Sequence, residues 1–491
     1  MKAFTEPLLS LAGFEEMTKT AEKSSGLISV TGCIDAQKSQ MIYAFGGHRK
    51  NKLIVTFGEQ KAKELYDEYS FFDKEVVYYP SKDVLFYQSD IRGNLLTAER
   101  IRALKAIREQ ERVTLVTTFD ALMNTMAPIE KMWENVLTLE LGQLLDLKEI
   151  QAALIRMGYE KEYQVQTMGQ FSVRGGILDV FPLTEENPIR IELWGDEIDT
   201  IRYFDCESQK SIENIDRVSI YPAAELVLSD EEKAGGIDKL KAEAKRVSDK
   251  LRKQMKTEEA HRVTVMADEL TEEWGELSMY AGMDAFLSYF FDERVGLLDY
   301  FKPSDSLIFF DELTRCVEQG KLTETEFSES MKQRLAMGYI LPGQMNGLFT
   351  EKEIVAKLEK YSCIALGALD NKANGLHQLG SYGIHCQSVS PYNNSFELLI
   401  KDLKRYKKNG YRVILLSGSR TRAKRLSEDI TDQGITCFYT ENYDHELFEG
   451  QIMVCYGKVR RGFEYPILKF AVITESDIFG AQQKKKKRHR T

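Results

Sequence analysis

The feature that most constrains the fold is an alternation of short β-rich runs and helical stretches between residues 25 and 126. Such alternation is typical of a parallel sheet flanked by helices. A later apolar run, 306–310, ends in Asp311 and Glu312 and is assigned to the same sheet, so an insertion precedes it. We expect strands at 26–30, 53–57, 76–79 and 114–118, and helices at 59–69, 97–110 and 119–125.

Changes in this pattern predict a multidomain α/β protein with a small α+β insert. Around 128–214 the expected strands become shorter and turns more frequent. The stretch 237–259 is dense in charge and lacks proline and glycine, which predicts one long, mostly exposed helix. A last α/β unit is expected from strands at 412–416, 435–439, 452–456 and 470–474 and a helix at 419–432.

The predicted boundaries follow from these changes. They are 1–126 for the first part of the first domain, 127–214 for the insert, 215–340 for the second part with the long charged helix, 341–480 for an α/β spacer domain, and 481–491 for a basic linker.

Composition limits the classes of function. The 491 residues carry 66 Lys and Arg against 76 Asp and Glu, a formal charge of −10, which gives no overall attraction to a phosphate backbone. A local basic run, 484–490, could be a nucleic-acid-binding arm, but we interpret it as a linker. No apolar stretch is long enough to span a bilayer and no signal pattern opens the chain, so we expect a cytoplasmic protein without membrane contact.

The seven cysteines occur singly, without Cys-x-x-Cys pairs or histidines at metal-ligand spacing. We therefore expect reduced thiols, no zinc site and no disulfide framework.

The alternation of strands and helices resembles half of a RecA-like motor domain. In such a domain a P-loop follows the first strand, and the corresponding loop in this chain is 29–36. A P-loop needs glycines that let N–H groups surround phosphate, a lysine, and a hydroxyl residue for magnesium. Here Gly32 is kept, but Asp35 replaces the lysine and Ala36 replaces the hydroxyl residue. Together with the acids Asp311 and Glu312, these residues predict a degenerate nucleotide site without catalysis. The alternative for the loop at 29–36 is a plain strand-to-helix turn, and the alternative for Asp311 and Glu312 is a helix cap.

Longer stretches strengthen this interpretation. They are Thr-Thr-Phe-Asp-Ala-Leu-Met at 117–123, the stretch 169–182, Glu-Leu-Trp-Gly-Asp-Glu-Ile-Asp at 192–199, and Ile-Thr-Glu-Ser-Asp-Ile-Phe-Gly at 473–480. These stretches resemble the N-terminal, UvrB-like half of the bacterial transcription-repair coupling factors (Mfd), and the resemblance covers essentially the whole chain.

The resemblance implies that the insert imitates the UvrA-binding domain of UvrB, with Arg174, Arg190 and Trp194 as contact residues. Period-two alternation over 189–194 places Arg190 and Trp194 on one polar strand face, and an exposed tryptophan is typical of a binding surface. Arginine near an aromatic residue is also common at interface hot spots. For Arg174 the alternative is a structural salt bridge with Asp179 or Glu192.

In the family, the complete protein recognises stalled RNA polymerase, moves on double-stranded DNA with an ATP-driven motor, and recruits UvrA. The resemblance implies that ATP and Mg²⁺ belong to motor domains beyond Thr491, so no cofactor is expected in this chain. It also implies that a C-terminal domain covers the UvrA site until activation.

Two functions from different classes remain. The first is a non-catalytic adaptor that binds UvrA, and the second is a UvrB-like ATP-dependent DNA repair helicase. The substitutions at 29–36 favour the adaptor. The path over 79–90 is also short where UvrB has a long DNA-clamping hairpin, and no Gln-x-x-Gly-Arg-x-x-Arg motif occurs.

Overall fold

The computed structural model describes residues 1–45, 50–83, 93–276 and 282–480. The first domain is built on a seven-stranded sheet whose neighbouring strands are all parallel. This confirms the multidomain α/β class that the alternation predicts. In spatial order the strands are β15 (Gln378–Gly383), β1 (Gly26–Thr31), β14 (Ser362–Leu366), β13 (Ser306–Asp311), β2 (Asn51–Thr56), β4 (Val113–Thr118) and β3 (Val77–Tyr79).

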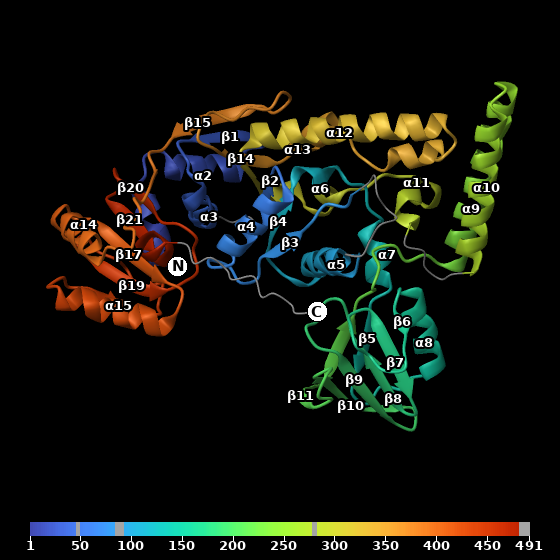
Figure 1. The fold of residues 1–491 in the computed structure, drawn as a ribbon, viewed down its shortest axis with the longest axis horizontal. Helices are drawn as coiled ribbons and strands as arrows, with labels where there is room; N and C mark the ends of the chain where they lie inside the picture. The colour runs from blue at the N-terminus through green and yellow to red at the C-terminus, as the bar shows by residue number, and fades with distance from the viewer. Residues whose placement is uncertain (46–49, 84–92, 277–281, 481–491) are drawn as a thin grey trace.

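Helices cover both faces of this sheet (Figure 1). Successive strand residues point to opposite faces, so Ile308 and Phe310 enter one core while Leu307 and Phe309 enter the other. The first core is shared with α5 (Gly93–Glu109), α6 (Phe119–Met123), α7 (Ile129–Glu134), α12 (Leu313–Ala336) and α13 (Glu351–Leu358). The second core is shared with α1 (Lys2–Thr5), η1 (Glu6–Ser10), α2 (Phe14–Lys23), α3 (Asp35–Ala44) and α4 (Glu59–Tyr69).

The insert, in green below the first sheet in Figure 1, is a six-stranded sheet with a separate strand pair. The insert was predicted to end at 214, but β12 pairs with β5, so the insert extends to Ile220. Helix α8 (Leu147–Arg156) packs against one face of the sheet. The strands are β5 (Leu137–Glu140), β6 (Glu160–Lys161), β7 (Gln170–Arg174), β8 (Ile177–Val180), β9 (Ile189–Trp194), β10 (Glu197–Phe204), β11 (Ser211–Ile215) and β12 (Arg217–Ile220).

The stretch predicted as one helix over 237–259 is two antiparallel helices, α9 (Asp230–Lys253) and α10 (Thr257–Glu276). The chain reverses at Met255, whose φ of 62° lies in the left-handed region. The reversal packs Leu240 of α9 into a common core with Val263 of α10. The prediction was wrong because burial of apolar side chains, and not helix propensity, decides where this helix ends.

Short helical turns lead from this helical hairpin back to the sheet. They are η2 (Met283–Phe286), α11 (Leu287–Phe290), η3 (Leu297–Tyr300) and η4 (Pro303–Asp305), and η5 (Pro342–Asn346) follows α12.

A second six-stranded sheet forms the last domain, in orange and red in Figure 1. We predicted this domain from residue 341, but β14 and β15 pair with β1, which places residues 362–383 in the first sheet. The boundary was wrong because a buried apolar strand does not indicate by composition which sheet it joins. The elements are β16 (Gln387–Ser388), α14 (Phe396–Lys408), β17 (Arg412–Ser417), α15 (Arg420–Asp432), β18 (Phe438–Tyr439), β19 (Ile452–Tyr456), β20 (Phe463–Tyr465), β21 (Phe470–Thr474) and α16 (Glu475–Phe479).

An ion cluster fixes the point where the chain leaves the insert. Glu225 is buried and pairs with Lys82 and with Arg100, whose Nε lies 2.9 Å from a Glu225 oxygen. Arg100 also donates to the Pro80 carbonyl at 2.6 Å, and Lys82 Nζ lies 2.7 Å from Asp284. Burial raises the pKa of the Glu225 carboxyl, but the charges of Arg100 and Lys82 outweigh this and lower it to about 2.

Glu225→Gln should reduce the dependence of stability on acidic pH. The folded-state pKa lies below the unfolded one, so the carboxylate's contribution is present above about pH 4.5 and is lost as the pH falls towards 2. Between about pH 5 and pH 2, the free energy of unfolding of the wild type in urea should fall by about 3 kcal/mol more than that of the variant. The exposed Glu231, changed to Gln, serves as the control and should follow the wild type. Identical pH curves for wild type and Glu225→Gln would refute this role of the cluster.

Candidate functional sites

The loop after β1 is closed by the chain itself. Gly32 has a φ of +77°, and a Cβ atom there would lie 2.0 Å from the Ile384 carbonyl oxygen, so only glycine fits. The N–H of Gly32 donates to the Ala368 carbonyl at 3.1 Å, and the N–H of Cys33 donates to the Gly367 carbonyl at 3.0 Å. Two amides of this loop are therefore bonded to a neighbouring loop.

A buried lysine stands between the acids at the carboxyl edge of the sheet. Lys38, on the second turn of α3, places its Nζ 2.5 Å from Asp311, 3.0 Å from Glu312 and 3.2 Å from Asp35. The Lys38 side chain is 1% exposed. Thr56 donates to the other Asp311 oxygen at 2.8 Å. Both oxygens of this buried carboxylate are thus satisfied within the protein.

Electrostatics favour the charged forms of Lys38 and Asp35. Burial alone would lower the pKa of the Lys38 ammonium, but the charge and hydrogen bond of Asp311, with the charges of Glu312 and Asp35, raise it above its ordinary value. For Asp35, burial raises the pKa, but Lys61 at 2.8 Å and the charge of Lys38 lower it below its ordinary value. One ammonium therefore compensates part of the negative charge of Asp35, Asp311 and Glu312.

The structure brings three of the five predicted nucleotide-site residues, Asp35, Asp311 and Glu312, around Lys38. Ala36 instead packs against the second core, and Gly32 forms the turn. Sequence reasoning missed Lys38, because the polar run at 37–40 has the appearance of a solvated helix face. All four residues are buried, since the last domain covers α3: the Tyr465 hydroxyl donates to Gln40 Oε1 at 3.0 Å.

Lys38→Met should destabilise the protein strongly. The change leaves the buried Asp311 carboxylate without its cation, which typically costs about 3–5 kcal/mol. Urea unfolding measures the loss, and the double variant Lys38→Met/Asp311→Asn should recover part of it because the uncompensated charge is gone. Lys61→Met is the matched control, expected to cost under about 1 kcal/mol because its partner Asp35 is exposed. A Lys38→Met protein as stable as the control would exclude this role for Lys38.

The second candidate site is the face of the insert's sheet opposite α8. Asp179 on β8 is buried and lies directly across from Arg190 on β9. Arg190 donates two hydrogen bonds to Asp179 at 2.7 and 2.8 Å, a third to Gln209 at 2.8 Å, and stacks over the Phe204 ring at 4.3 Å. Arg174 on β7 donates to Asp179 at 3.1 Å. Both arginines thus share one buried carboxylate, which fixes their positions.

The two arginines differ in exposure. The Arg174 side chain is 37% exposed, whereas that of Arg190 is 12% exposed. The salt bridge between Arg174 and Asp179 that sequence reasoning left as an alternative is present, and it leaves much of the Arg174 guanidinium free for a partner. Arg190 holds the Asp179 carboxylate with two hydrogen bonds and exposes only a small part of its own side chain.

Trp194, at the end of β9, is 83% exposed, as its place on the polar strand face predicts. It pairs with Glu197 of β10, and Glu197 forms a bridge with Leu144 in the loop after β5. Side chains of directly paired residues lie on the same face, so Leu144, 75% exposed, flanks Glu197 on the Trp194 side of the sheet. Sequence reasoning missed Leu144, because only the pairing of this loop with β10 brings it there.

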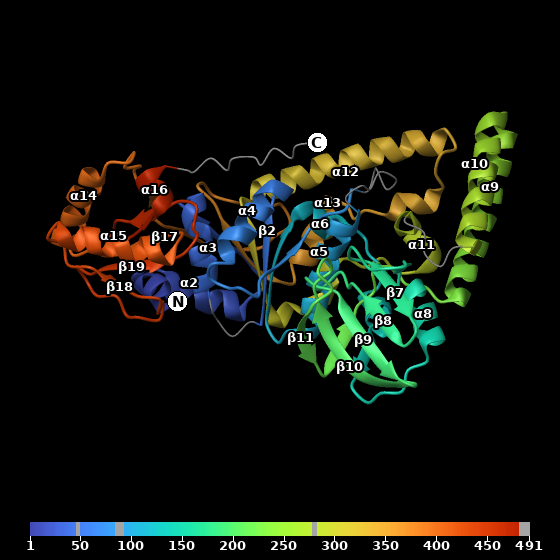
Figure 2. The same cartoon turned by 60° about the horizontal axis from the view of Figure 1, so that its bottom comes forward.

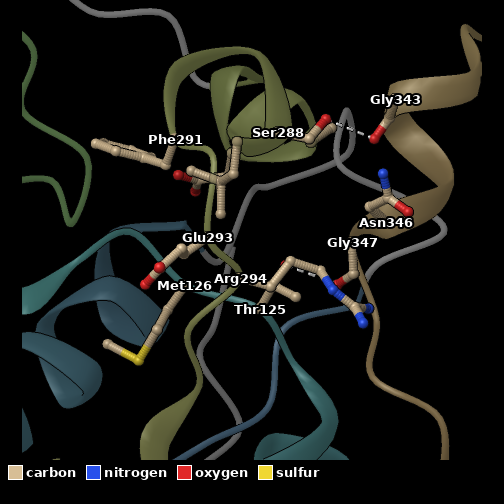
Figure 3. A pocket seen from close by; sticks show the side chains of 12 residues that line it. Thr125, Met126, Ser288, Phe291, Glu293, Arg294, Gly343, Asn346 and Gly347 are labelled. Atoms are coloured by element: carbon tan, nitrogen blue, oxygen red, sulfur yellow. Dashed lines mark hydrogen bonds between the residues drawn. The ribbon is translucent and has the colours of Figure 1, made fainter. Parts of the chain in front are cut away.

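A small pocket elsewhere in the first domain contains none of these residues (Figure 3). Its polar groups bond to nearby backbone: Ser288 donates to the Gly343 carbonyl at 2.7 Å, Thr125 to that of Gly347 at 3.0 Å, and Arg294 to that of Leu348 at 3.3 Å. We assign it no role.

The described residues also lack two other kinds of functional feature. Within the four described ranges, no three His, Cys, Asp or Glu side chains gather as a metal site would require. In the same part of the chain, no helix combines the length and apolar character that crossing a bilayer demands.

Comparison with known proteins gives consistent matches. Residues 137–226 match the family model of the UvrB interaction domain. The chain is 28% identical over 437 residues to the transcription-repair-coupling factor of Bacillus subtilis, covering 89% of this chain and 36% of that protein. It is 26% identical to those of Staphylococcus haemolyticus and Staphylococcus aureus MRSA252, covering 94% and 97% of this chain and 39% and 40% of theirs. The chain therefore spans less than half the length of these relatives, and it matches their N-terminal part.

Proposed function

We propose that this chain, which matches the N-terminal part of transcription-repair-coupling factors, is a non-catalytic adaptor that recruits UvrA to sites where RNA polymerase has stalled at DNA damage. The insert carries the binding surface, and the two α/β domains support it. The observation that carries this proposal is the exposed Trp194 and Leu144, beside arginines fixed by Asp179, on one face of the UvrB interaction domain.

The chemistry of this surface suits a protein partner. An exposed tryptophan supplies a large apolar contact area, and arginine held by a buried carboxylate loses little conformational freedom on binding. Such anchors surrounded by polar residues are typical of interface hot spots. We define the adaptor surface as Arg174, Arg190, Trp194 and Leu144.

The absence of catalysis is part of the same proposal. The closed loop at Gly32 and the Lys38 ammonium between Asp311 and Glu312 occupy the places where phosphate and Mg²⁺ would bind. Phosphoryl transfer depends on those contacts. ATP hydrolysis, RNA polymerase binding and movement on double-stranded DNA are then properties of other parts of the complete protein, whose C-terminal domain covers the adaptor surface before activation.

Binding to purified UvrA tests the adaptor surface. Trp194→Ala should weaken the affinity about 30-fold, equivalent to about 2 kcal/mol, because the aromatic anchor is lost. Arg174→Ala and Leu144→Ala should each weaken it by a smaller factor. Biolayer interferometry with immobilised UvrA gives the dissociation constants.

Phe448→Ala is the matched control, since it removes an exposed aromatic residue, 56% exposed, from the last domain. It should bind UvrA as the wild type does. Arg190→Ala also removes two hydrogen bonds from the buried Asp179. Its melting temperature should therefore be measured together with its affinity for UvrA. No binding by the wild type would reject the adaptor function. Normal binding by a Trp194→Ala/Leu144→Ala double variant would reject only this surface.

Calorimetric titration with ATP and Mg²⁺ tests the absence of catalysis. We expect no heat of binding and no DNA-stimulated release of phosphate, because the loop amides and the acids are already partnered. A micromolar dissociation constant, or phosphate release that rises with added DNA, would favour the UvrB-like helicase instead.

A further inference from the structure

The helical hairpin of α9 and α10 stands apart from the sheets. Both views show it at the far end of the molecule from the last domain, with the chain reversal at its free end (Figures 1 and 2). Residues 252–258 at this end are all exposed, and Met255 is 88% exposed. We call residues 245–262 the hairpin tip.

Charge is segregated along this hairpin. The tip holds seven Lys and Arg but only three Asp and Glu. The remainder, 230–244 and 263–276, holds three Lys and Arg and ten Asp and Glu. The whole chain has a net charge of −10, so a random distribution of charged residues does not favour a cationic tip on an otherwise acidic helical hairpin. The segregation therefore calls for an explanation beyond the solubility of an exposed helix pair.

The lysines of the tip are available to a ligand. Lys245, Lys250, Lys253 and Lys256 are exposed, and none forms an ion pair with another residue in the described ranges. Elsewhere, by contrast, Lys38, Lys61 and Lys82 are each held by carboxylates. Lys250 and Lys253 are three residues apart on α9, so their unpaired ammonium groups repel one another, and a polyanion would relieve that repulsion.

The tip is also held in place. Gly338, just after α12, packs so closely that a Cβ atom there would lie 2.5 Å from the Glu259 carbonyl oxygen. The Arg262 guanidinium stacks over the Tyr339 ring at 4.9 Å and donates to its hydroxyl at 2.9 Å. A braced cationic end loses less freedom when it binds than a free tail would.

We propose that the hairpin tip binds the phosphate backbone of double-stranded DNA. From Lys245 to Lys253, α9 rises about 12 Å at 1.5 Å per residue, a length that passes about three or four phosphates of one strand, and Lys256 lies just beyond the end of this helix. Lysine binds phosphate as a point charge without reading sequence, so the contact is independent of base sequence and sensitive to salt. This site lies outside the adaptor surface and does not depend on UvrA binding.

Fluorescence anisotropy of the full chain with a labelled 30-base-pair duplex tests the proposal. At about 50 mM salt we expect measurable binding, and Lys250→Ala/Lys253→Ala/Lys256→Ala should weaken it at least tenfold. The slope of log K against log salt should become shallower by about 2.7, which is three lost contacts at about 0.9 each. Circular dichroism should show unchanged helix content, because the three side chains are exposed.

The matched control is Lys401→Ala/Lys404→Ala/Lys408→Ala on α14, which removes the same charge from another exposed helix face. It should retain wild-type affinity and slope. Equal loss in both variants would overturn the proposal as a general charge effect. No loss in the tip variant would overturn it in favour of another source, such as the basic run 484–490. Stronger, tip-dependent binding to phosphatidylserine vesicles than to the duplex would overturn it in favour of a lipid surface.

Discussion

The packing of the first domain depends on one buried ion pair, Lys38 with Asp311, whose ammonium also contacts the more exposed Glu312 and Asp35. Acids at the carboxyl edge of a parallel sheet repel one another and attract water or cations, so a second domain cannot cover them unless their charge is cancelled. Lys38 compensates part of this charge from within the same helix that the last domain covers, and it pairs most closely with the buried Asp311. As a result, α3 lies buried between two domains, and residues of both sheets share one core.

Much of this architecture could be predicted from the sequence. The strands over 26–30, 114–118, 452–456 and 470–474 and the helix over 59–69 lie where the pattern places them, because apolar runs and helix periodicity are local properties. Strand pairing, by contrast, joins residues that are far apart in the sequence. Ser362–Leu366 could join either sheet by composition, and its neighbours β1 and β13 show that it joins the first. Likewise, Met255 is no helix breaker by type, and the chain reverses there because α9 and α10 bury each other's apolar stripe.

The candidate sites follow the same division. Period-two alternation alone predicts the exposure of Trp194, and Trp194 is exposed in the structure. Lys38 and Leu144 could not be found in this way, since one reaches acids far along the chain and the other pairs with Glu197 across a sheet edge. The proposed DNA contact also needed the fold, because the cations of 245–262 form an end only once the chain reverses. The linker expected at 481–491 and part of the short path over 79–90 lie outside the described residues and stay predictions.

Helix α12 begins directly after Glu312 and ends at the residues that brace the hairpin. Its 24 residues form a helix about 36 Å long. The start of this helix lies beside Lys38, and the residues just after its end contact the hairpin through Gly338 and Tyr339. The helix therefore sets the distance between the carboxyl edge of the first sheet and the hairpin.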